Sequence, residues 1–140
     1  MHFLPWSKEY ETGIREVDAQ HEHIFYIIDQ IFVAIEANKP QNDLQKLITD
    51  LADYAKWHVK QERDIVKFIH DLDTEFHQKR DHEFLEVITT CASEFRQNNT
   101  IIERLILQFL KSWVLIHIMI DDKDICLDSS NGFNIPELGY

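Results

Sequence analysis

The chain has 140 residues, a length typical of one domain, and its 44% hydrophobic and 28% charged residues are ordinary for a soluble globular protein. It carries 14 Lys and Arg against 25 Asp and Glu, and this formal net charge of −11 argues against nucleic acid or an anionic membrane surface as partner. Its 3 Gly and 3 Pro are too few for a sheet of many short strands. The 8 histidines are the remaining unusual feature.

The cysteines and the apolar segments indicate the compartment. Cys91 and Cys126 are too few and too far apart for a disulfide framework or a cysteine-based zinc site, so they fit a reducing environment. The N-terminus has no basic stretch followed by an apolar one, and we expect no signal peptide. The most apolar segment, residues 113–120, is too short for a transmembrane helix. We therefore expect a cytoplasmic protein without a membrane partner.

Helical periodicity and polar breaks predict four helices, because Gly and Pro are absent between Pro40 and Gly132. The predicted helices cover about residues 18–38, 43–70, 75–98 and 100–124. Asp18 is a suitable N-cap for the first. Short connections make consecutive helices antiparallel, so the expected fold is all-α, an up-down-up-down antiparallel four-helix bundle. Residues 1–17 are expected to form an N-terminal arm packed on the bundle (18–124), and residues 125–140 a C-terminal tail.

Each predicted helix has an apolar stripe that is interrupted by a side chain able to bind metal. In chain order the stripes are Ile24, Phe25, Ile28, Ile31, Phe32 and Ile35; Leu44, Leu47, Leu51, Tyr54, Ile65 and Ile69; Phe84, Ile88, Cys91 and Phe95; and Leu105, Ile106, Phe109, Trp113 and Ile120. The interruptions are His21; His58 and Glu62; His77 and Asp81; and His117. The other histidines are His2, His23, His70 and His82, and we expect them at the surface.

The antiparallel topology brings these interruptions to one end of the bundle. His21 and His77 lie near the starts of their helices, whereas His58, Glu62 and His117 lie in the C-terminal halves of theirs. A buried carboxylate is disfavoured unless it is paired or bound to metal. Imidazole and carboxylate donors suit iron, zinc or manganese, and more than four ligands exceed one tetrahedral structural zinc. The pattern predicts two metal ions bridged by carboxylates.

The sequence resembles the hemerythrin family, in particular its bacterial branch, over nearly the whole chain to about Lys123. The matching segments are Asp18-Ala19-Gln20-His21, His58-Val59-Lys60-Gln61-Glu62, His77 with Asp81-His82-Glu83-Phe84-Leu85, and Trp113-Val114-Leu115-Ile116-His117-Ile118 with Asp122. The resemblance implies a cofactor of two iron ions with a bridging oxo or hydroxo group. It also implies that O2 is the ligand, bound reversibly as a hydroperoxide at one iron.

By this resemblance, His21 and His58 hold the iron with the open position, His77 and His117 hold the other, and Glu62 and Asp122 bridge the pair. Asp122 lies about 140° beyond His117 on a regular helix, so Asp121 is better placed on ideal geometry. A local π-type widening of the helix would bring Asp122 round. We follow the family and expect Asp122, with Asp121 as the alternative.

Asp81 stands where the family has a histidine ligand. His82 is adjacent but lies about 100° off the stripe, so we expect Asp81 to face the metals, directly or through water. An anionic oxygen ligand favours ferric iron, which predicts faster autoxidation than in a typical O2 carrier. The resemblance places Val59, Trp113, Val114 and Ile118 around O2. Val59 and Val114 are smaller than the usual Phe and Leu, so we expect a roomier, wetter pocket.

The expected function is O2 binding for storage, delivery or O2/redox sensing, rather than catalysis. One alternative is a diiron enzyme acting on peroxide, O2 or NO, which Asp81 favours. Another is the sensor module of a larger signalling protein, whose state is passed to a signalling partner. The sequence predicts no oligomeric state.

Overall fold

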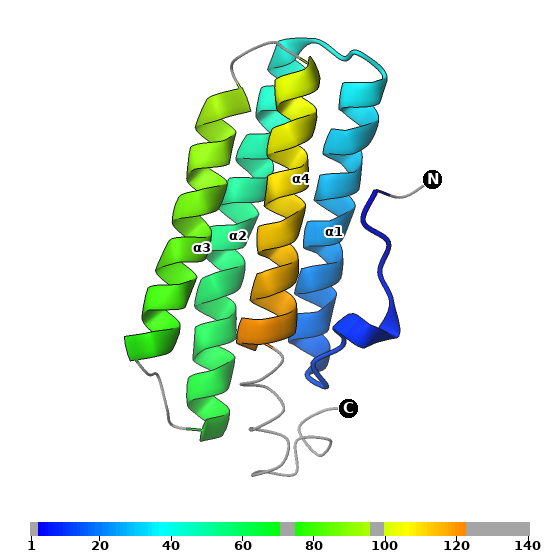
Figure 1. The fold of residues 1–140 in the computed structure, drawn as a ribbon. Helices are drawn as coiled ribbons and strands as arrows, with labels where there is room; N and C mark the ends of the chain where they lie inside the picture. Colours follow the sequence, from blue (N-terminus) through cyan, green and yellow to red (C-terminus); the bar gives the residue numbers. More distant parts are fainter. Residues whose placement is uncertain (1–2, 71–74, 96–99, 123–140) are drawn as a thin grey trace.

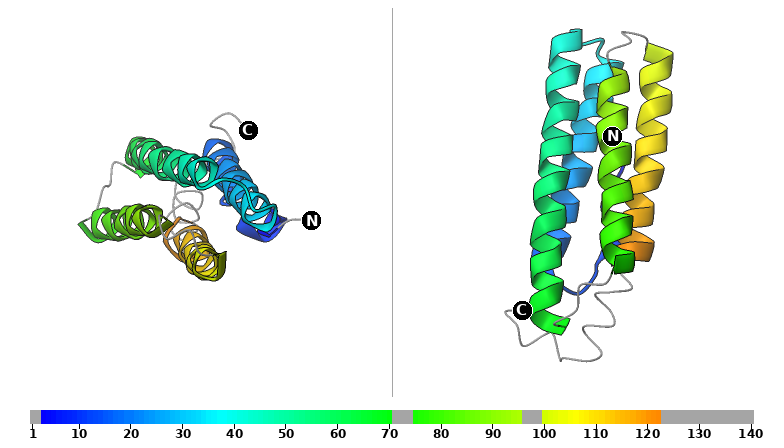
Figure 2. Two further views of the ribbon diagram at one scale, coloured as in Figure 1. Left: turned by 90° about the horizontal axis from the view of Figure 1, so that it is seen from above. Right: turned by 90° about the vertical axis from the view of Figure 1, so that its left-hand side faces the viewer.

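The protein is an antiparallel bundle of four long helices, described by a computed structural model for residues 3–70, 75–95 and 100–122. Its elements are η1 (Lys8–Tyr10), α1 (Arg15–Glu36), α2 (Gln41–His70), α3 (Glu75–Glu94), α4 (Thr100–Ile116) and η3 (His117–Asp122). Each long helix packs against the two beside it (Figures 1 and 2). The prediction of an all-α up-down-up-down bundle is confirmed. None of the described helices has the length and apolar character needed to cross a bilayer.

The N-terminal arm packs on the bundle, as predicted. The rings of Trp6 and Tyr10 meet the ring of Phe25 edge-on, at centroid distances of 5.0 and 5.2 Å. Leu4 is buried, and its backbone N–H donates a hydrogen bond to Asp29 Oδ1 at 2.9 Å. Aromatic contacts and a buried hydrogen bond therefore hold the arm against α1.

The start of α1 differs from the prediction, because the helix begins at Arg15 rather than near Asp18. The Asp18 carboxylate accepts hydrogen bonds from the backbone N–H and the hydroxyl of Thr12, both at 2.7 Å. The Thr12 hydroxyl oxygen in turn accepts the backbone N–H of Ile14 at 3.2 Å. Asp18 thus ties the arm to the first turn of the helix instead of capping it.

The predicted core stripe of the fourth helix is wrong at two residues, although Ile106 of the same stripe packs against the core. Leu105 and Phe109 were expected in the core, but they are 64% and 54% exposed. The buried face of α4 consists of Glu103, Leu107, Leu110 and Val114. A row of residues four apart rotates by about 40° at each step around an α-helix. The row through Leu105 and Phe109 therefore begins in solvent and turns into the core only at His117.

The last helix is also less regular than predicted. Its α-helical part ends at Ile116, and residues 117–122 form the π-helix η3. This is the kind of local widening that would bring Asp122 to the same face as His117. Asp124, the predicted end of this helix, lies outside the described residues. The third helix was expected to end within residues 96–99, which also lie outside the described residues; α3 ends at Glu94.

Glu103 is a carboxylate on the buried face of α4, at the opposite end of this helix from His117. It is 4% exposed, and its Oε2 atom has no hydrogen-bond partner in the described part of the chain. Burial raises the pKa of the Glu103 carboxyl above its ordinary value. The ionised side chain therefore destabilises the fold at neutral pH.

We expect Glu103→Gln to raise the free energy of unfolding at pH 7 by about 1 kcal/mol. The ordinary pKa is 4.5, and the folded-state pKa is higher. The unchanged chain therefore loses stability as the pH rises from the ordinary pKa through the raised one. The gain from Glu103→Gln should vanish near pH 4, where the carboxyl is protonated in both the folded and the unfolded state. Urea unfolding at both pH values measures this, with the exposed Glu22→Gln as control. An equal gain at both pH values would contradict the explanation.

Candidate metal site

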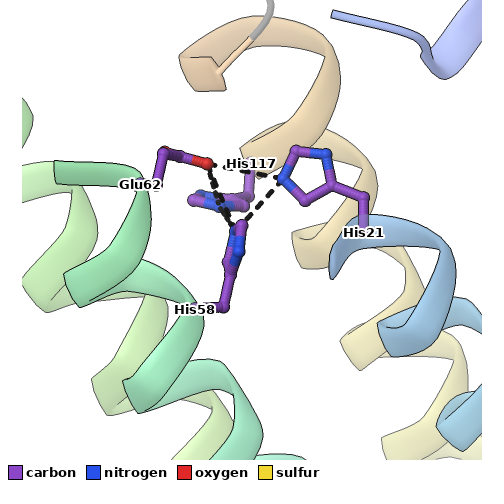
Figure 3. Close-up of side chains that lie close together, drawn as sticks. All are labelled: His21, His58, Glu62 and His117. Atoms are coloured by element: carbon purple, nitrogen blue, oxygen red, sulfur yellow. Dashed lines mark hydrogen bonds and ion pairs between the residues drawn. The ribbon is translucent and has the colours of Figure 1, made fainter. Parts of the chain in front are cut away.

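Four side chains able to bind metal meet at one end of the bundle (Figure 3). They are His21 from α1, His58 and Glu62 from α2, and His117 from the start of η3. All four are buried, and one donor atom from each lies within 4.8 Å of the others. The structure therefore brings together four of the seven predicted ligands.

The donor atoms lie as close as ligands that share an ion. The Nε2 atom of His58 is 3.1 Å from Nε2 of His21 and 3.3 Å from Nε2 of His117. Glu62 Oε2 is 3.2 Å from His58 Nε2 and 3.5 Å from His21 Nε2. Two donors bound to one ion at about 2.1 Å are separated by about 3.0–3.4 Å in octahedral or tetrahedral geometry. The spacing and chemistry of the donors fit a transition metal.

Gln20 orients the His58 ring, a role that the sequence analysis missed. His58 Nδ1 donates a hydrogen bond to the Gln20 amide oxygen at 2.7 Å, and both side chains are buried. With its proton on Nδ1, a neutral His58 directs the lone pair of Nε2 toward the other donors. A cation among them would stabilise that arrangement. The sequence signal was a polar residue directly before His21, but nothing there indicated its partner on α2.

Phe84 connects α3 to the cluster. Its ring stacks on the ring of His117, with centroids 4.0 Å apart and planes at 4°. This contact limits rotation of the imidazole about its own axis. The sequence analysis treated Phe84 only as a core residue, because stacking on a histidine from another helix leaves no sequence signal.

Asp81 and His82 lie on different faces of α3, one buried and one exposed, as helical periodicity predicts. Asp81 is buried, whereas the His82 side chain is 79% exposed, with Nε2 3.3 Å from Glu86 Oε2. Asp81 is not one of the four clustered residues. Its role as a ligand stays a prediction.

The side chains of the remaining predicted ligands, His77 and Asp122, lie outside the described residues, as does that of the alternative, Asp121. The backbone of η3 nevertheless bears on the choice between the two aspartates. A π-helix closes its turns between residues five apart, which is the spacing from His117 to Asp122. Asp122 therefore remains the better candidate.

The predicted O2-pocket residues are close in sequence to the clustered histidines. Val59, Val114 and Ile118 are buried, and Trp113 is half-buried. Their burial agrees with a pocket and equally with core packing, so the pocket itself stays a prediction.

The model of the hemerythrin HHE cation binding domain matches residues 12–126 of this chain. The chain belongs to the hemerythrin family. A relative, the bacteriohemerythrin of Clostridium acetobutylicum, is 23% identical over 129 residues, which cover 85% of this chain and 95% of the relative. The matched region contains the cluster and all the predicted ligands of this hemerythrin-family chain.

We expect Gln20→Leu to weaken metal binding by about 10- to 100-fold, because it removes the acceptor that orients the His58 ring. Chelator competition with Fe²⁺ measures the affinity, and circular dichroism checks that the bundle is intact. Gln30→Leu, on the same helix but away from the cluster, is the control. Unchanged affinity in a folded Gln20→Leu variant would contradict the role of Gln20.

Proposed function

We propose that this chain is a non-heme diiron protein that binds O2 reversibly, for storage, delivery or O2/redox sensing. The observation that carries the proposal is the buried group of three imidazoles and one carboxylate, whose donor atoms lie within 4.8 Å of one another. Membership of the hemerythrin family and similarity to a bacteriohemerythrin support iron as the metal and O2 as the ligand.

The proposed ligands divide between two ions. His21 and His58 would hold the ion with the open position. His77, Asp81 and His117 would hold the other, and Glu62 and Asp122 would be ligands common to both. The iron pair, with its oxo or hydroxo bridge, supplies the electrons that reversible O2 binding needs. Glu62 contributes negative charge beside the imidazoles, which offsets the charge of the cations in a buried setting.

The apolar side chains next to the ligands have a separate role. Val59 follows His58 directly, and Val114 and Ile118 flank His117; all three are buried. As apolar side chains around the open position they would limit the access of water, and with it the loss of a proton or an anion from the site, although Val59 and Val114 leave more room than the family's larger residues. Together with Trp113 they form the proposed O2 pocket.

We expect the purified protein to contain two iron ions per chain. On exposure of the reduced protein to air, a new visible absorption band should appear, and it should disappear on removal of O2. Metal analysis and spectra before and after air measure both properties. Absence of iron, or zinc in its place, would contradict the diiron proposal. Irreversible oxidation would contradict reversible O2 binding, but it would leave the diiron proposal standing.

Asp81 is expected to shorten the life of the oxygenated form, because a carboxylate stabilises ferric over ferrous iron. We therefore expect Asp81→His, which restores the family's residue, to prolong that lifetime several-fold. The decay of the absorption band in air measures it, with the exposed His82→Gln as control. An unchanged or shorter lifetime in Asp81→His would contradict the effect assigned to Asp81.

The burial of Asp81 also favours the second candidate function, an enzyme acting on peroxide, O2 or NO. An extra carboxylate makes the site resemble carboxylate-rich diiron centres of four-helix bundles. Steady turnover with an electron donor supports the enzyme, whereas a stable oxygenated form supports O2 binding.

A further inference from the structure

The outer face of α4 is unusually apolar and contributes neither to the core nor to the metal site. Half of the large hydrophobic side chains that are exposed in the described residues belong to this helix: Ile101, Ile102, Leu105 and Phe109. Ile101, Leu105 and Phe109 are four residues apart and form a continuous row, which Trp113 extends. Contiguous apolar surface of this kind marks interaction sites more often than scattered exposed residues do.

The last two residues of this row line an open groove of about 440 Å³ between α3 and α4, and the row continues from the groove onto the outer face of α4. Phe109 and Trp113 line one side of it, and Val87, Glu83 and Glu86 line the other. The two helices run side by side (Figures 1 and 2). The groove therefore combines an apolar wall with an acidic rim.

The length of the apolar row on α4 fits one helix of a partner. Residues 101–113 rise by about 18 Å along α4, at about 1.5 Å per residue. A partner helix of about 12 to 16 residues spans this length. Its apolar side chains, at positions such as i, i+4 and i+7, match a row of this kind.

We propose that the α3–α4 groove binds an amphipathic helix of a partner protein, with Lys or Arg beside its apolar face. The chain has a formal net charge of −11, and α3 has five carboxylates against two Lys and Arg residues. Glu83 and Glu86 line the groove. Arg80 lies 3.7 Å from Glu83, and His82 lies 3.3 Å from Glu86. One fixed positive charge therefore stands beside two carboxylates, and the rim stays acidic when His82 is neutral. Basic flanks on the partner complement this rim and speed the encounter.

The charges disfavour a second copy of this chain as the occupant. A second copy brings the same acidic rim and the same net charge. The two cations on the other flank of α4 already have partners within the chain: Arg104 lies 2.9 Å from Glu36, and Lys111 Nζ donates to the carbonyl oxygen of Phe3 at 3.1 Å. A basic partner helix brings charge opposite to the rim and does not depend on the cations of α4.

The groove lies near the four clustered residues, although α3 and α4 carry none of them. Trp113 of α4 is one turn before His117, and Phe84, next to Glu83 on α3, stacks on the His117 ring. An occupant of the groove thus contacts elements that pack around the site. Any effect of docking on O2 binding rests on the proposed function, but docking itself does not.

Two synthetic peptides test the proposal on the full chain as purified. The first is a 16-residue helix with Leu along one face and Lys on both flanks, and the second has Glu in place of Lys. Fluorescence anisotropy of the labelled peptides measures their affinity. We expect the Lys peptide to bind at least about tenfold more tightly than the Glu peptide. Equal affinities, or no binding of either, would overturn the proposal.

Phe109→Glu separates docking in the groove from general attraction to an acidic protein. It places a charge in the apolar wall, so we expect affinity for the Lys peptide to fall at least about tenfold. Attraction by net charge alone would make the same variant bind more tightly. Phe68→Glu is the matched control, because Phe68 is exposed on α2 and the charge change is identical.

Glu86→Lys tests the acidic rim, and we expect this variant to bind the Lys peptide more weakly. Asp50→Lys is the control, because Asp50 is exposed on α2 and the charge change is identical; it should weaken peptide binding less. Binding that is insensitive to both Phe109→Glu and Glu86→Lys would overturn the proposal. So would a dimer in sedimentation that Phe109→Glu dissociates, since it would assign the groove to a second copy. The peptide results do not depend on iron, so failure of the diiron proposal leaves them interpretable.

Discussion

The close approach of three imidazole Nε2 atoms and one carboxylate oxygen inside an apolar core is the constraint on which the rest of this structure depends. Polar groups buried at this depth destabilise a bundle unless something satisfies them. Gln20 fixes the proton of His58 on Nδ1, which leaves the Nε2 lone pair directed at two other imidazoles and the carboxylate of Glu62. Bound metal ions would satisfy that arrangement, because the cluster offers three imidazoles and one carboxylate as ligands.

Several features of the bundle serve this end of the molecule. The antiparallel topology brings the start of α1 beside the late part of α2 and the end of α4. The α-helix gives way to a π-helix at His117 itself, so the irregularity coincides with a cluster residue. π-type turns are rare and are frequently found at functional sites. The arm, packed through Trp6 and Tyr10 against α1, covers the same helix that carries His21.

The sequence predicted the bundle and the meeting of four of its polar residues because both follow from periodicity and helix direction. It did not predict contacts between side chains on different helices. Gln20 and Phe84 gave no sign of their contacts with His58 and His117. It also failed where a stripe was followed in steps of four. Such a row rotates around the helix, so Leu105 and Phe109 are in solvent although His117 is in the core. That error left the exposed apolar face of α4 unrecognised.

Anomalous diffraction at the iron absorption edge, from crystals of the protein as purified, tests the central claim most directly. The account predicts two peaks about 3.5 Å apart, one on each side of Glu62. His21 and His58 should bind one ion, and His117 should bind the other. A single peak bound by His21, His58 and His117 together would contradict a diiron site, and no peak at these residues would contradict iron as the bound metal.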